Sequence, residues 1–356
     1  MPQESSSPRP YRLKEYLNWP LLGIILAWLV LITQVRHHWG GESYYNFGIF
    51  VPFLAVWLLL RNFAEVRPRP EARITGPLVL GALALLLALP FHALSEVNPF
   101  WRLPLWIQAV GLVVFTMCAL YPIYGRVGVL RAAFPVFFLC MMIPWPYRLE
   151  LEVVQTLTHF VVGLSINILH FIGYPVELAG NSMVLGELRI GVNEACSGIR
   201  SLQALFMVCL FLGSLFGQGV IRRLAALLIL PLIVIIVNAG RAVFLATQVI
   251  VNGDAAYERW HDPAGYIAFG ISMVLIYACI ELLNIGSKRS GQPLSVSAGS
   301  LKELVRVPNL PTPAIAYVLL PALLFVVVEG WFQFKERTAV ERPGWTFQLP
   351  DPGDSS

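Results

Sequence analysis

The chain has 356 residues, of which 57% are hydrophobic and only 13% are charged, and its mean hydropathy is +0.68. Soluble domains carry about 25% charged residues, so this composition excludes an ordinary soluble globular fold. The 25 basic and 21 acidic side chains give a net charge of +4, which suggests no nucleic-acid partner. The sequence therefore predicts an all-α polytopic membrane protein.

Nine apolar segments are long enough, or nearly so, to cross a bilayer, which takes about 20 residues. In chain order they cover residues 20–35, 45–60, 76–94, 103–121, 127–145, 198–217, 224–251, 263–285 and 314–333. We interpret the first as a span and not as a removable signal peptide, because no small-residue cleavage pattern follows it. We expect a catalytic multispan domain over 19–285, a cytoplasmic linker over 286–313, an additional span over 314–334, and tails over 1–18 and 335–356.

Basic residues orient these spans, since Lys and Arg are enriched in cytoplasmic loops. Arg9, Arg12 and Lys14 place the N-terminus in the cytoplasm. Later basic groups mark four further inner loops: Arg61 to Arg73, Arg126 with Arg131, Arg222 with Arg223, and Lys288 to Arg306. These assignments agree only if the chain crosses the membrane an even number of times between Arg131 and Arg222.

The segment 151–172 looks helical, but polar residues such as Gln155, His159 and Asn167 interrupt its apolar pattern. A spanning helix here would break the even count, so we favour a helix that lies in the outer interface or re-enters the membrane. Residues 176–192 alternate polar and apolar side chains around Gly180 and Gly186. This pattern predicts a short outer β-like segment of one or two strands.

Of the five cysteines, Cys196 alone lies outside an apolar run, in the stretch Asn193-Glu194-Ala195-Cys196-Ser197-Gly198-Ile199-Arg200. It precedes a predicted span, and a helix N-terminus favours the nucleophilic thiolate. Arg200, one helical turn later, could help. The alternative is an inert interfacial cysteine. The cysteines have no CxxC or metal-type spacing, so we predict neither a cofactor nor a metal.

Arg241 is the only charged residue between Arg223 and Asp254. An arginine within a span is expensive and suggests function by default; the alternative is snorkelling to the outer headgroups. Eighteen residues separate it from Arg223, or roughly 27 Å of helix, which predicts a position near the outer interface. Asn238 lies one turn earlier on the same face.

His261 falls on the predicted outer loop just before the span at 263–285, next to Asp262. Histidine is the usual general acid or base near neutral pH, although an ordinary loop histidine is the alternative. The basic-loop topology brings Cys196, Arg241 and His261 to one level on the outer side. A thiol, a guanidinium and an imidazole together form a plausible acyl-transfer site.

The segment Glu194-Ala195-Cys196-Ser197-Gly198, then Asn238-Ala239-Gly240-Arg241, then His261 resemble the exosortase/archaeosortase family, and the resemblance extends to about residue 285. It implies a membrane cysteine transpeptidase with Cys196 as nucleophile, Arg241 as oxyanion-binding partner and His261 as acid/base, supported by Asn238, Ser197, Gly198 and Arg200. The last span, 314–333, has no match to this family core, and we assign it no role.

The implied partners are exported proteins with a tripartite C-terminal signal: a Pro-Glu-Pro-like (PEP-CTERM) motif, a transmembrane helix and a basic cluster. The resemblance implies that the exported protein is transferred from Cys196 to an unknown acceptor. The implied location is the inner membrane of a bacterium that secretes exopolysaccharide, amid membrane lipid, with the site facing the periplasm. Two alternatives are a polytopic transporter with Arg241 as an anion site, and a non-catalytic scaffold in which Cys196 is unreactive.

Overall fold

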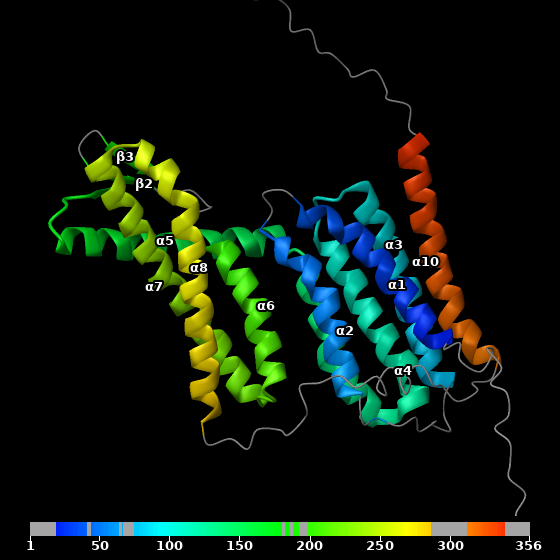
Figure 1. Cartoon of the computed structure of the whole chain (residues 1–356). Helices are drawn as coiled ribbons and strands as arrows, with labels where there is room; N and C mark the ends of the chain where they lie inside the picture. The colour runs from blue at the N-terminus through cyan, green and yellow to red at the C-terminus, as the bar shows by residue number, and fades with distance from the viewer. Residues whose placement is uncertain are drawn as a thin grey trace, which may run out of the picture.

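A computed structural model describes residues 19–40, 44–63, 66, 75–179, 182–185, 188–191, 198–285 and 312–338. These residues are mostly helical, and one small sheet follows α5 (Figure 1). The main helices are α1 (Trp19–Val35), α2 (Val51–Asn62), α3 (Thr75–Val97), α4 (Leu103–Phe138), α5 (Tyr147–Phe171), α6 (Ile199–Leu215), α7 (Val220–Asn252), α8 (Ala255–Asn284) and α10 (Thr312–Thr338). The short 3₁₀ helices are η2 (Arg36–Trp39), η3 (Asn46–Phe50) and η4 (Leu139–Met142).

The helices form two neighbouring groups, α1 to α4 with α10 in one and α5 to α8 in the other (Figure 1). The first group packs around one apolar core whose members include Leu31, Leu58, Leu85, Leu112 and Phe325. The second group has two smaller cores, both of which include residues of α7. Aromatic side chains meet where the groups touch, with the rings of Trp57 and Phe211 5.7 Å apart.

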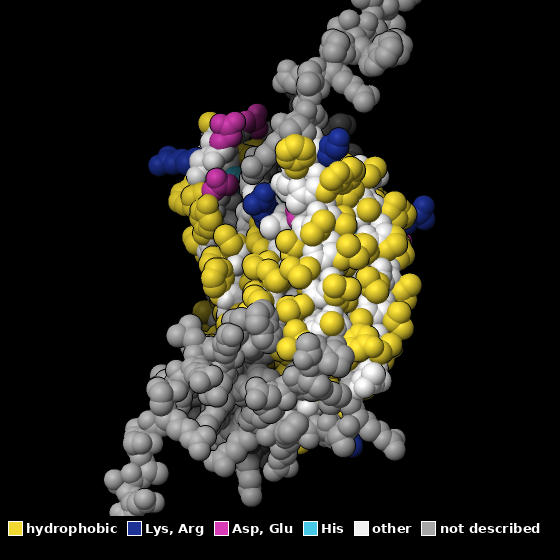
Figure 2. Space-filling view, turned by 90° about the vertical axis from the view of Figure 1, so that its right-hand side faces the viewer, with side chains coloured by type: hydrophobic (Ala, Val, Ile, Leu, Met, Phe, Trp, Pro, Cys, Tyr) yellow, Lys and Arg dark blue, Asp and Glu magenta, His cyan; other side chains and the backbone are white. Residues whose placement is uncertain are grey.

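The outward faces of these helices are as apolar as the inward ones. In α3, Leu85 is fully buried whereas Leu87 is 71% exposed, although both are leucines. Figure 2 shows hydrophobic side chains over most of the described face, with charged side chains gathered toward its upper end. Such a surface requires lipid around it.

Seven helical stretches in the described chain are long and apolar enough to cross a membrane: 20–39, 75–97, 103–142, 147–171, 220–252, 255–284 and 315–335. The apolar stretches 46–62 and 199–215 are shorter. The chain is therefore a multi-pass membrane protein.

Two of the predicted spans, 103–121 and 127–145, do not form separate helices joined by a loop. The first span and residues 127–138 of the second lie within α4, which is interrupted at Gly125, where φ is +61° and ψ is −164°. The rest of the second span forms η4 and the residues that follow it. Glycine adopts a positive φ without the steric penalty that a Cβ brings. A sharp break at one residue thus replaces the expected inner loop, and Arg126 follows it directly.

Helix α5 lies across the other helices of its group instead of running beside them (Figure 1). Its buried side includes Val154, Leu157 and Val161, whereas its exposed side carries polar residues that include Glu152, Gln155, Thr156, His159 and Asn167. Length and composition alone would also let it span. The crosswise direction and the polar outer face support the interfacial interpretation.

The segment after α5 contains three short antiparallel strands, β1 (Glu177–Ala179), β2 (Ser182–Leu185) and β3 (Leu188–Gly191), in the order β1-β2-β3. Register pairs Leu178 with Met183 and Met183 with Ile190. The sequence had suggested one or two strands here. The sheet lies at the upper end of the α7–α8 pair (Figure 1).

The helix ends alternate as the basic residues predict. The end of α2 with Arg61, the break in α4 before Arg126 and the start of α7 with Arg222 and Arg223 all lie at the lower end in Figure 1. The starts of α6 and α8 and the end of α7 lie toward the opposite end. The predicted tail over 1–18 lies outside the described residues, as do residues 286–311 of the predicted linker 286–313 and residues 339–356 of the predicted tail 335–356. The remaining residues of that linker and tail belong to α10.

Candidate active site

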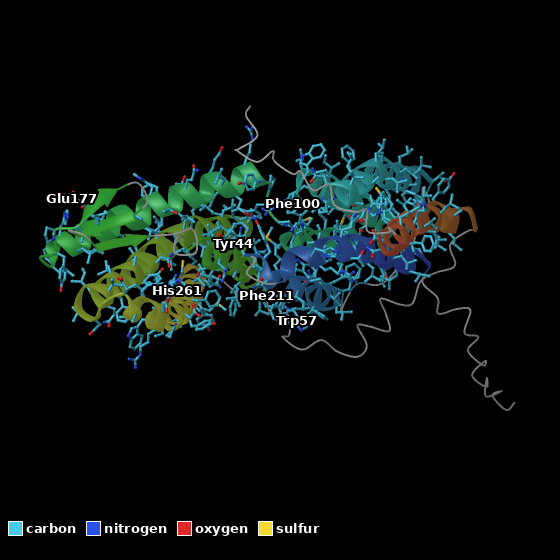
Figure 3. The ribbon with its side chains drawn as sticks, turned by 90° about the horizontal axis from the view of Figure 1, so that it is seen from above. Tyr44, Trp57, Phe100, Glu177, Phe211 and His261 are labelled. Atoms are coloured by element: carbon cyan, nitrogen blue, oxygen red, sulfur yellow. The ribbon has the colours of Figure 1, made fainter. Side chains whose placement is uncertain are left out.

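A cavity of about 410 Å³ lies where the two groups of helices meet. Its walls come from the start of α6, from α7 and α8, and from the segment 44–47 that precedes α2. In Figure 3, Tyr44 lies near the junction of the two groups, and His261 lies over the α7–α8 side. The predicted site residues that line this cavity are Gly198, Arg200, Asn238, Arg241 and His261. The other two, Cys196 and Ser197, lie outside the described residues.

Gly198 sets the start of α6 against α7. It is the N-cap of α6 and has a φ of +83°, in the left-handed region. A Cβ at this position would lie 2.3 Å from Nδ2 of Asn238, which is only 5% exposed. The sequence predicted that Asn238 and Arg241 lie on the same face of one helix. The structure adds that Asn238 packs directly against the glycine that follows Cys196 and Ser197.

Replacing Gly198 with alanine should therefore destabilise the protein. A left-handed non-glycine residue costs about 1–2 kcal/mol, and the clash with Asn238 adds an overpacking cost of about 1–3 kcal/mol. We expect Gly198→Ala to lower the thermal midpoint measured in detergent. The matched control is Gly240→Ala on α7, where a Cβ would meet nothing within 4 Å. Equal midpoints for the two variants would contradict this reading.

Arg241 and His261 are in direct contact. The guanidinium Nη2 donates to His261 Nε2 at 3.1 Å and to the His261 carbonyl oxygen at 3.2 Å. Arg241 Nε is buried and has no hydrogen-bond partner among the described residues. Nη2 thus holds the guanidinium against His261, and the Nε–H of Arg241 remains free to donate.

His261 is part of a helix and not of a loop, which corrects the sequence prediction. Helix α8 begins at Ala255, eight residues before Pro263, so the turn that carries His261 is already helical. The sequence suggested a loop because a proline inside a helical pattern commonly marks a boundary. Likewise, α7 continues for eleven residues beyond Arg241, to Asn252, so Arg241 lies well before the end of its helix.

The imidazole of His261 is held from both sides. Its Nδ1 lies 2.9 Å from Oδ1 of Asp262, whose side chain is 77% exposed. A carboxylate only accepts hydrogen bonds, so Nδ1 carries the proton in this pair. Nε2, which receives the Arg241 hydrogen bond, is then the acceptor of a neutral ring. This is the tautomer that a general base requires.

Sequence reasoning missed several residues of the cavity wall. Gly265 lies one turn after His261 on α8, and a Cβ there would be 3.4 Å from Arg241 Nη2, so this small residue leaves room for the guanidinium. The i, i+4 spacing of His261 and Gly265 was the available signal. Tyr44 also lines the cavity, and Arg200 lies over its ring at 5.7 Å.

A buried polar network fixes the segment that carries Tyr44. The Tyr45 hydroxyl donates to the Glu150 carboxylate and accepts from Gln203 Nε2 at 2.9 Å and from the Trp145 backbone N–H at 2.8 Å. Arg102 Nη1 binds the same carboxylate at 2.7 Å. Burial, with the hydrogen bond to Glu150, raises the pKa of Tyr45 above its ordinary value. The hydroxyl therefore stays protonated and ties the cavity wall to α5 and α6.

Comparison with known families shows to which family the chain belongs. The family model for transmembrane exosortases (Exosortase_EpsH) matches residues 39–278, about two thirds of the chain and every described residue of the cavity. Comparison with curated proteins and with solved structures finds no match. Exosortases are cysteine transpeptidases that act on exported proteins with C-terminal sorting signals. With its multispan helices and the extent of this match, the chain belongs to the transmembrane exosortase family.

Proposed function

We propose that this protein cleaves C-terminal sorting signals from exported proteins through a thioester on Cys196 and transfers the new carboxyl end to an acceptor. The observation that carries the proposal is the contact between Arg241 and His261 in a cavity that Gly198 also lines. Cys196 is two residues from Gly198 along the chain, and two residues span at most about 7 Å. The thiol is therefore within chain reach of the cavity.

In the first half-reaction, His261 Nε2 takes the proton of the Cys196 thiol and the sulfur attacks the carbonyl carbon of the scissile peptide. A C–S bond forms, and the carbonyl electron pair moves onto the oxygen. The free Nε–H of Arg241 can donate to this oxyanion. His261 then gives its proton to the leaving nitrogen as the C–N bond breaks, which leaves the thioester.

In the second half-reaction, a nucleophile of the acceptor loses a proton to His261 Nε2 and attacks the thioester carbonyl. The C–S bond breaks, and the sulfur leaves as the thiolate or thiol. Arg241 serves both steps, since each forms an oxyanion at the same carbonyl oxygen. When His261 Nε2 takes a proton, it can no longer accept from Nη2, which holds it at 3.1 Å in the resting structure. The hydrogen bond from Nη2 to the His261 carbonyl oxygen at 3.2 Å can remain.

The helix ends that carry the basic residues support a site on the outer side of the inner membrane. The start of α6, which follows Cys196, lies at the end opposite to Arg61, Arg222 and Arg223. Under the positive-inside rule the basic end is cytoplasmic, so substrates would arrive from the periplasm. Nothing in the described residues or in the family favours the transporter alternative.

The proposal is tested by trapping the thioester. The full-length protein in membranes is mixed with an exported reporter that ends in a Pro-Glu-Pro-like motif, a transmembrane helix and a basic cluster. We expect a covalent adduct of enzyme and reporter that neutral hydroxylamine releases. Cys196→Ser should give no hydroxylamine-sensitive thioester, whereas Cys279→Ala, which removes a partly buried thiol of α8, should form the adduct normally. Cleavage of the reporter by wild type without any thioester would refute the mechanism.

Asp262 should make a smaller contribution as a positioning residue. Its carboxylate orients the His261 ring at 2.9 Å, but its exposure leaves the interaction screened by solvent. We expect Asp262→Asn to lower kcat about threefold to tenfold with little change in KM. The exposed Glu258→Gln, one residue after Tyr257 on the same helix, is the control. A loss as large as that of a His261→Ala variant would show that Asp262 does more than orient the ring.

A further inference from the structure

A second polar cavity, of about 560 Å³, lies between α1, α3, α4 and α10, apart from the candidate active site. Figure 3 shows Phe100, which lines it, in the group of α1 to α4 and well separated from His261. Its floor is formed by Gln34 of α1 together with Ser95 and Glu96 of α3. Helix α10, which the family match does not include, supplies Phe332, Gln333 and Lys335.

Buried ionisable groups lie directly behind this floor. His92 is completely buried, and its Nε2 lies 3.5 Å from Oε2 of Glu329, which is 7% exposed. Gln34 Nε2 donates to Glu96 Oε1 at 2.6 Å and to the His92 carbonyl oxygen at 3.3 Å. Glu96 and Glu329 interact electrostatically, so one cluster joins the cavity floor to α10. Ionisable groups at this depth usually serve a function.

The hydrogen bonds fix which atoms of this cluster are acceptors. Gln108 Nε2 donates to Ser95 Oγ at 2.8 Å, so its Oε1 faces His92 Nδ1 at 3.3 Å. An amide oxygen cannot donate, so His92 Nδ1 carries a proton. Gln34 cannot be flipped without turning its oxygen toward Glu96, so Gln34 Oε1 is an acceptor as well.

Three buried polar atoms of the cluster have no hydrogen-bond partner among the described residues: Gln34 Oε1, His92 Nε2 and Glu329 Oε2. The last two face each other at 3.5 Å and do not line the cavity, and Glu329 Oε1 accepts from Thr33 and Gln333. Gln34 Oε1 is therefore the unmet acceptor at the cavity itself. Gln34 is 8% exposed and still lines the cavity. A buried acceptor that lacks a donor is unfavourable. At the cavity itself, the Glu96 carboxylate and the unmet Gln34 Oε1 together match a cationic, donor-rich group.

We propose that this cavity binds a primary ammonium group, with Glu96 and Gln34 as its direct ligands. An ammonium offers three N–H donors and no acceptor, which complements the unmet Gln34 Oε1 and the Glu96 carboxylate. Among the described residues, no group of three or more His, Cys, Asp or Glu side chains could hold a metal ion. Phe100 and Phe332 add aromatic faces that attract cations.

The ammonium could belong to a lipid headgroup or to a free amine, and both have the same chemistry. The chain's own ammonium at this cavity, Lys335, lies six residues after Glu329 on α10, or roughly 9 Å along the helix. Lys335 is exposed and lines the same cavity, so its removal tests whether its ammonium competes for the site. The binding site requires α10, which gives this additional helix a role of its own.

The test uses the full-length protein with two probes. One is a nanodisc of phosphatidylethanolamine and phosphatidylglycerol, with retained lipid counted by native mass spectrometry. The other is free ethanolamine, compared with ethylene glycol, with binding measured by thermal shift. We expect wild type to retain phosphatidylethanolamine preferentially, by at least fivefold over phosphatidylglycerol. A thermal shift with free ethanolamine in addition would show that the cavity also takes soluble amines.

Glu96→Gln should remove this preference, because it replaces the carboxylate by an amide of the same shape. Gln34→Met, which removes the acceptor but no charge, should weaken binding at least threefold and guards against a folding defect in the first variant. The control Glu152→Gln changes an exposed carboxylate of α5 and should bind as wild type does. Lys335→Met should bind the amine at least as well as wild type. Absence of ammonium binding by both probes, unchanged binding in Glu96→Gln, or loss of binding in Lys335→Met would each overturn the proposal.

Discussion

Cys196→Ala should abolish processing of a signal-bearing reporter while the protein still inserts and accumulates in the membrane. The substitution removes the sulfur that forms the thioester, and no other described thiol can replace it. Cys118, Cys140, Cys209 and Cys279 lie within apolar helices or at their ends, and none of them lines the cavity with Arg241 and His261. In a protease whose catalytic residues act as a unit, removing the nucleophile lowers kcat by about 10⁶-fold.

The measurement is the ratio of cleaved to full-length reporter after co-expression, read by immunoblot, with enzyme amount read from an epitope tag. Cys279→Ala is the matched control and should process at the wild-type rate. Cys196→Ser tests whether an oxygen nucleophile suffices, and we expect it to be nearly inactive because the hydroxyl is far less acidic than a thiol. Full processing by Cys196→Ala would remove the basis of the proposed function.

Hydropathy predicted the bounds of a helix well where the apolar run itself stops at the end of that helix. Helices α1, α6 and α10 agree with the predicted segments to within a few residues, because apolar runs there stop at polar or glycine-rich sequence. Hydropathy failed to predict the course of the chain at Gly125, where a single residue interrupts α4. Arg126 and Arg131 suggested an inner loop beside Gly125, and composition alone could not show that the helix resumes directly after this residue.

For Arg241 and His261, the sequence predicted the level at which they lie but not their contact, and the position of Cys196 stays a prediction. Consecutive spans of predicted direction bring Arg241 and His261 to one end, but a hydrogen bond also depends on how α7 and α8 are rotated about their axes. The sequence fixes that rotation only through small packing residues, such as Gly265 beneath the guanidinium. The pairing of Asp262 with His261 likewise required the backbone to be helical at that point.

The second polar cavity escaped the sequence analysis for a different reason. Glu329 lies within the predicted span 314–333, to which the sequence assigns no role. Its partners, His92 and Glu96, come from a helix more than 200 residues earlier. An apolar helix does not reveal which neighbours it packs against, so the placement of α10 on α1 and α3 could come only from the structure.

Arg241→Lys should lower kcat by about 10² to 10³, although it preserves the positive charge. The loss expected for one oxyanion donor is about 2.7–4 kcal/mol. Lysine has no rigid fork, so it cannot bind His261 through one edge while keeping a second donor free, as Arg241 Nη2 and Nε do. Arg259→Lys is the matched control, because Arg259 lies exposed two residues before His261. The readout is the initial rate of reporter cleavage in membranes with equal enzyme content. A rate for Arg241→Lys within threefold of wild type would mean that only the charge matters and that the guanidinium geometry described above has no catalytic role.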